Sequence, residues 1–126
     1  MDKEKVILRL KDFGYEYDDA KDSASLDFAI SKTSWSILNA TNCADIPEGL
    51  TFVAMDMVCA EFLKIKKSFG QLTEIVFENV AKSISMGDTS ITFAEEASPE
   101  QKFDVVVDYL LTGHEDEFLA YRKLVW

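Results

Sequence analysis

Histidine, cysteine and proline are scarce in this chain, and each shortage excludes a class of protein. The 126 residues include one His, two Cys and two Pro. Cys43 and Cys59 lie far apart with no CxxC spacing, so zinc sites built on His and Cys are nearly excluded. The same spacing favours two reduced core thiols, as in a cytoplasmic setting, over a fold held by a disulfide.

Positive charge is also in short supply. The chain has 13 Lys and Arg against 23 Asp and Glu, which gives a formal net charge of -10. Such a surface opposes non-specific attraction to DNA, RNA and anionic membranes. The one basic run, residues 64–68 ("KIKKS"), is explained as the end of a helix, where cations complement the helix dipole. A phosphate-contacting role for this run is the alternative.

Long apolar runs are absent as well. Hydrophobic residues make up 48% of the chain, but no apolar run is long enough to cross a bilayer. The segment 1–12 mixes charges of both signs and has no long apolar stretch, which argues against a signal peptide. The length and composition therefore predict one soluble, intracellular domain covering residues 1–126.

No catalytic signature is present, whether a GxSxG elbow, a phosphate-binding loop or a dinucleotide fingerprint. The cluster "HEDE" at 114–117 suggests a metal site, but consecutive helical residues point in different directions, and the dipole explains acids at a helix start. Asp56 is either a buried acid tuned for proton transfer or, as the cost of an isolated buried carboxylate favours, a residue on an exposed strip or paired across a subunit contact. We expect no enzyme activity, no catalytic residue, no metal and no cofactor.

Helical periodicity covers most of the chain and predicts about five helices. The segment from Leu50 to Leu63 is apolar nearly all the way round, which indicates a central helix packed on several sides. Ser98 to Gln101 has the pattern of a capping box with proline at the first helical position. Residues 15–22 are predicted to form an acidic linker whose charges are solvated. The five predicted helices span residues 2–13, 22–41, 47–69, 99–112 and 115–124.

Residues 82–93 depart from this periodicity. Side chains alternate on both sides of Gly87 and Asp88, a pair that suits a type II′ turn with glycine first. A two-stranded ribbon leaves both its edges unpaired, so we predict that another chain pairs with it. The alternative is that its apolar face covers helices of the same chain. The predicted fold is therefore mainly α, a small helical bundle with one inserted β-hairpin.

The hairpin and the C-terminal end together give a predicted interface. Tyr, Arg and Trp are enriched at protein interfaces, although aromatic residues near a terminus also dock that terminus onto its own domain. The predicted interface residues are Ile84, Met86, Thr89, Ile91, Phe93, Tyr121, Arg122 and Trp126.

The order of these features resembles a known family. "AKSISMGDTSITF" (81–93), then a proline-capped helix, then "FLAYRKLVW" (118–126) is similar to the small head-tail connector (adaptor, or neck) proteins of long-tailed bacteriophages, prophages and tail-like particles. The likeness is sharpest at 83–93 and 121–126. It implies a structural virion protein, made in the bacterial cytoplasm, that is not an enzyme.

The resemblance also implies a set of partners. It implies that the chain forms a homo-oligomeric ring, of about twelve copies. The ring lies below the portal protein, contacts tail-completion or tail tube proteins, and leaves a channel through which DNA only passes. In that family the hairpin segment and the terminal residues make the contacts.

Other functions remain open at this point. The long acidic link at 15–25 departs from a typical connector, and a collar subunit of a headless, bacteriocin-like contractile particle also suits the sequence. An acidic DNA-mimic inhibitor of a host protein is a second alternative. A small hydrolase or metal-dependent enzyme centred on His114 and its acidic neighbours is a third.

Overall fold

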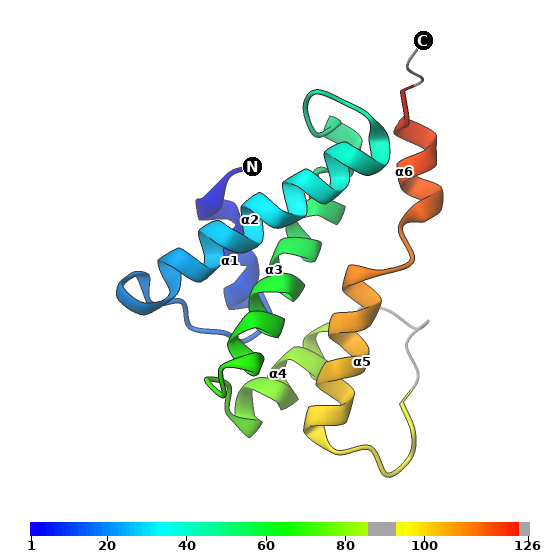
Figure 1. Ribbon diagram of the computed structural model, residues 1–126. Helices are drawn as coiled ribbons and strands as arrows, with labels where there is room; N and C mark the ends of the chain where they lie inside the picture. The colour runs from blue at the N-terminus through cyan, green and yellow to red at the C-terminus, as the bar shows by residue number, and fades with distance from the viewer. Residues whose placement is uncertain (86–92, 124–126) are drawn as a thin grey trace.

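The computed structural model describes residues 1–85 and 93–123, and these form an all-helical domain with no strand among them (Figure 1). The mainly α fold class is thus confirmed. The elements are α1 (Lys3–Asp12), α2 (Asp19–Thr41), a 3-10 turn η1 (Glu48–Leu50), α3 (Thr51–Ser68), α4 (Glu74–Ser85), α5 (Pro99–Leu111) and α6 (Glu115–Tyr121).

Helix α3 is the centre of the domain, as its apolar composition predicts. Helices α1, α2 and α5 all pack against it, and α4 packs against α5 (Figure 1). Val58, Phe62 and Leu63 of α3 are fully buried. Because apolar residues occupy most of its circumference, α3 can bury side chains toward three neighbours at once.

The helix ends follow the local sequence signals. The Ser98 hydroxyl accepts a hydrogen bond from the Gln101 amide at 3.2 Å, and the Gln101 side chain accepts one from the Ser98 amide at 2.9 Å. The capping box is therefore confirmed. Helix α1 ends where Gly14 takes a left-handed φ of 85°, a conformation that residues with a Cβ rarely adopt.

The predicted β-hairpin is wrong in its first strand, because residues 82–85 continue helix α4. Val80 and Ala81 are buried against the core, and Phe77 packs on Phe103 of α5 with ring centroids 4.8 Å apart. This spacing of i, i+3 and i+4 carries the helix forward, and the Ser83 hydroxyl donates back to the Val80 carbonyl. Tertiary packing on α5 outweighs the local alternation of polar and apolar residues.

The prediction of a solvated acidic linker at residues 15–22 is also wrong at its end. Helix α2 already begins at Asp19, with Asp18 as its N-cap, and Asp22 is fully buried. The Asp22 carboxylate accepts hydrogen bonds from the Tyr15 hydroxyl at 2.8 Å and from the Asp18 amide at 3.0 Å, and its other oxygen lies 2.6 Å from Lys66 Nζ. This buried ion pair joins the start of α2 to the last turn of α3.

The C-terminal helix is attached more thinly than the others. No residue of α6 is buried, and its Phe118 packs against a second apolar cluster of Ile37, Leu50, Ala54 and Met57. Beyond α6, the Lys123 amide donates to the Thr41 carbonyl at 2.8 Å. Of the helices described, none is long and apolar enough to traverse a membrane.

Candidate functional site

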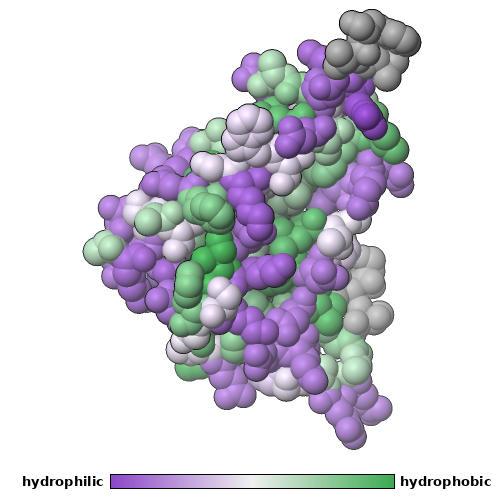
Figure 2. Space-filling view, in the orientation of Figure 1, coloured by the Kyte–Doolittle hydropathy of each residue, from purple (hydrophilic) through white to green (hydrophobic). Residues whose placement is uncertain are grey.

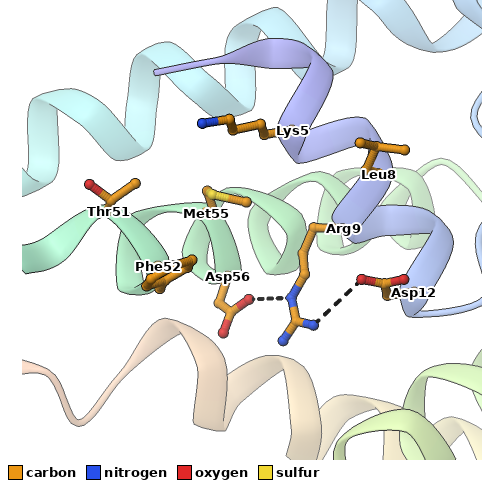
Figure 3. A pocket seen from close by; sticks show the side chains of 8 residues that line it. All are labelled: Lys5, Leu8, Arg9, Asp12, Thr51, Phe52, Met55 and Asp56. Atoms are coloured by element: carbon orange, nitrogen blue, oxygen red, sulfur yellow. Dashed lines mark hydrogen bonds and ion pairs between the residues drawn. The ribbon is translucent and has the colours of Figure 1, made fainter. Parts of the chain in front are cut away.

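An open groove of about 660 Å³ runs between α1 and the first half of α3 (Figure 3). Helix α1 contacts α3 through the fully buried Val6 and Leu10, which leaves its flanking residues to form one wall. The other wall comes from the N-terminal turns of α3. The lining residues are Lys5, Leu8, Arg9, Asp12, Thr51, Phe52, Met55 and Asp56.

The apolar part of the groove is unusually open to solvent. Leu8 is 63% exposed and Phe52 is 80% exposed, while Met55 between the helices is half-buried and packs on the main core. Exposed large apolar side chains that line one depression, with polar groups at its rim, are typical of a surface that binds another molecule.

An ion pair closes one end of the groove. Arg9 Nε lies 2.8 Å from Asp56 Oδ1, and a terminal nitrogen of Arg9 lies 3.9 Å from Asp12 Oδ2 (Figure 3). The hydrogen bond to Asp56 raises the pKa of Arg9, although partial burial acts the other way. Asp56 is thus partly buried and paired with its own chain, and neither the proton-transfer interpretation nor the subunit-contact interpretation is needed to explain it.

We expect Asp56→Asn to lower the free energy of unfolding by only about 0.5 to 1 kcal/mol, because the Arg9 pair is partly solvated. The loss should shrink further as salt is added. Urea unfolding at low and high ionic strength measures both effects. A loss of several kcal/mol that salt does not change would show that the pair is more deeply buried than its geometry indicates.

The described residues do not form the metal site that the cluster at 114–117 suggests. Among them, no group of three or more His, Cys, Asp or Glu side chains converges as metal ligands would. His114 is used locally: Nε2 lies 2.9 Å from the Leu110 carbonyl and Nδ1 lies 3.3 Å from Glu117. Glu115 and Asp116 stay exposed in the first turn of α6.

The cysteines are free thiols. Cys59 is buried in the core, where desolvation raises the pKa of its thiol and makes the reactive thiolate rarer. Cys43 is only half-buried, in the loop after α2, so the prediction of a core position holds for Cys59 alone. Its sulfur lies 3.4 Å from the Tyr121 carbonyl.

The basic run at the end of α3 is neutralised within the chain. Lys66 is buried beside Asp22, and Lys67 Nζ lies 3.2 Å from Glu100 and 2.5 Å from Asp104 of α5. Two of its three lysines are therefore committed to carboxylates of the same fold. This arrangement disfavours a phosphate-contacting role and matches a cationic helix end.

Four of the eight predicted interface residues lie outside the described part of the chain: Met86, Thr89, Ile91 and Trp126. The predicted turn residues Gly87 and Asp88 lie outside it as well. Ile84 falls within helix α4 rather than in a strand. Phe93 is half-buried against the main core, with Lys102 Nζ 5.8 Å from its ring centroid, so at least this residue covers its own helices.

Tyr121 and Arg122 end helix α6 and sit on the outside of the molecule. Tyr121 is packed directly over Gly49, where any Cβ would collide with its ring. The Asn42 side chain donates to the Lys123 carbonyl at 3.0 Å. Tyr121 thus docks the C-terminal end onto its own domain, which is the alternative to an interface role given above. Arg122 remains exposed.

The groove itself was not among the predicted sites. Within α1, Leu8 lies about 200° around the helix from the buried Val6 at 100° per residue. That angle is a signal, present in the sequence, that Leu8 faces away from the core. Phe52 gives no comparable signal because α3 is apolar on most sides.

Comparison of the chain with protein families, curated proteins and solved structures found no match. Its class is therefore defined by its own features: an all-α domain with a solvent-open, amphipathic groove between α1 and α3.

Proposed function

We propose that this protein is a structural subunit that assembles with copies of itself, as the head-tail connectors it resembles do. The ring would join a portal protein to tail-completion or tail tube proteins and leave a channel for DNA. The observation that carries the proposal is the groove between α1 and α3, where the exposed Leu8 and Phe52 line one depression with charged residues around it, as at surfaces that bind another molecule.

The charge of the chain supports a conduit rather than a nucleic-acid-binding role. The net charge of -10 makes a lumen built from this subunit repel phosphate, so DNA would slide through without being held. Two of the three lysines in the basic run, Lys66 and Lys67, are paired with carboxylates of the same chain, which weakens the attraction of this run for phosphate.

The proposal excludes a catalytic role. Its support is that the one His is engaged with the Leu110 carbonyl and Glu117, and that the carboxylates of the groove pair with Arg9. A virion or tail-like particle would be the site of action.

Size-exclusion chromatography with light scattering tests the proposal on the wild-type chain. We expect species well above the 14.2 kDa monomer, with an oligomer fraction that rises with protein concentration. Added DNA should not co-elute at physiological salt, since the acidic subunit repels it. A monomer at every concentration up to the millimolar range would contradict the proposal.

The strongly acidic composition favours one second candidate, a DNA-mimic inhibitor of a host protein. That function predicts a monomeric chain and a salt-sensitive complex with a basic nuclease or polymerase. The two functions are therefore separated by the oligomeric state. A collar subunit of a headless particle would self-associate like a connector, and a neighbouring portal or capsid gene would separate these two.

A further inference from the structure

The groove is lined by a second cation besides Arg9. Lys5 is exposed at the rim, and no ion pair to it is found in residues 1–85 and 93–123, whereas Arg9 one turn later is paired with Asp56 and Asp12. Leu8 lies three residues after Lys5, so a cation and an exposed apolar side chain stand one turn apart on α1. Phe52 of α3 lines the same groove.

Helix α6 carries the complementary pattern on its outer face. Glu115 and Asp116 are exposed, and no ion pair to either is found in the described ranges. Leu119 is 60% exposed and lies four residues after Glu115 and three after Asp116. Two carboxylates and one apolar side chain therefore stand one turn apart on α6. Phe118 anchors the helix to its own domain, which turns Leu119 outward.

The two patterns match in spacing and in charge. In both helices the charged and apolar side chains are separated by one turn, about 5 to 6 Å between Cβ atoms. Laid side by side in the same direction, α6 would place Leu119 against Leu8 and Phe52 while its carboxylates reach Lys5. This contact buries apolar surface and pairs the Lys5 cation in one step.

The match cannot be satisfied within one chain. Helix α6 is held at the end of α2 by the Lys123 amide on the Thr41 carbonyl at 2.8 Å, and it lies on the other side of α3 from α1 (Figure 1). Apolar surface is also exposed between polar side chains on the face of the molecule that Figure 2 shows, so exposure alone does not single out the groove. The groove is singled out because its charge and spacing match those of α6.

We propose that the α1–α3 groove binds helix α6 of a second copy of this chain. The donor and acceptor surfaces are different parts of the molecule, so the contact is head-to-tail and repeats from copy to copy until a ring closes. This inference rests on the proposed function and identifies the surfaces that would carry self-assembly.

Two blocked variants of the full-length chain test the pairing. Leu8→Asp blocks the groove and Leu119→Asp blocks the α6 face, and both changes fall on exposed side chains, so the fold should survive. Phe28→Asp is the matched control, because Phe28 on α2 is 59% exposed but lies outside the groove. Sedimentation velocity should show self-association weakened about tenfold or more in each blocked variant and unchanged in the control.

Mixing the two blocked variants gives the decisive result. The Leu8→Asp variant keeps its α6 face and the Leu119→Asp variant keeps its groove. An equimolar mixture should therefore form heterodimers and nothing larger. Charge reversal adds a second readout: Lys5→Glu should weaken association, and combining it with Glu115→Lys and Asp116→Lys should restore it.

The outcomes separate this inference from the proposed function. Wild-type oligomers together with unchanged assembly of both blocked variants would overturn the groove–α6 contact and leave self-assembly intact. Weakened variants whose mixture stays monomeric would overturn head-to-tail pairing. A monomeric wild type would overturn the proposed function and this contact together.

Discussion

Asp22→Ala is expected to lower the free energy of unfolding by about 3 to 5 kcal/mol, because it leaves the Lys66 ammonium buried without a counter-charge. Lys66 is almost fully buried, and within the described residues its Nζ has two polar partners besides Asp22, the Gln71 side chain at 2.9 Å and the Lys21 carbonyl at 3.4 Å. Both remaining partners are neutral. Chemical denaturation followed by circular dichroism gives the value.

The double variant Asp22→Leu with Lys66→Met is the control. It removes both charges together, so it should be far less destabilised than Asp22→Ala, because replacing a buried ion pair by apolar residues of similar volume is often neutral or favourable. Equal losses in the single and the double variant would show that packing at these positions, rather than charge, sets the effect.

The same pair makes stability depend on pH. Burial alone would raise the pKa of Asp22, but Lys66, the Asp18 amide and the Tyr15 hydroxyl lower it below its ordinary value of 3.8. A lowered carboxyl pKa adds stability above the ordinary value, and that stability is lost as the pH falls below it toward the folded-state pKa. The acid-induced loss should therefore be steeper in the wild type than in the variant with both charges removed.

Phe62→Ala is expected to cost about 3 to 5 kcal/mol of unfolding free energy, because Phe62 is fully buried in the central helix. Tyr15 meets its ring edge-on with centroids 5.3 Å apart, and Lys66 Nζ lies 5.7 Å from its centroid. The substitution would also remove the ring that Tyr15 and Lys66 contact beside the Asp22–Lys66 pair.

Phe62→Leu serves as the matched variant and should cost clearly less, since it keeps most of the buried volume. Combining Phe62→Ala with Asp22→Ala should give less than the sum of the two losses, because the sites share Tyr15 and Lys66. Strict additivity would show that the ring and the ion pair are independent.

The helices that could be predicted from sequence are those with strong local signals. The apolar circumference of α3 and the capping box at Ser98 are properties of short segments, and both predictions are confirmed. The end of α4 is different, because alternation at residues 83–85 suits a strand and a helix alike. Packing of Phe77 and Val80 toward α5 decides the structure, and no local pattern reports that contact.

The buried ion pair of Asp22 and Lys66 could not be predicted from the sequence for a related reason. Asp22 stands in an acidic segment and Lys66 in a basic one, and each position has a sufficient local explanation as a solvated charge. The two residues are 44 positions apart, so only the crossing of α2 and α3 brings them within 2.6 Å. The groove is likewise a product of how α1 sits on α3.

The most direct test of the proposed ring is electron cryomicroscopy of the assembled wild-type protein. We expect a closed ring in which Leu119 of each copy lies between Leu8 and Phe52 of the next, with Lys5 facing the carboxylates of Glu115 and Asp116. A ring whose α1–α3 grooves are open to solvent, or a preparation that contains only monomers, would contradict it.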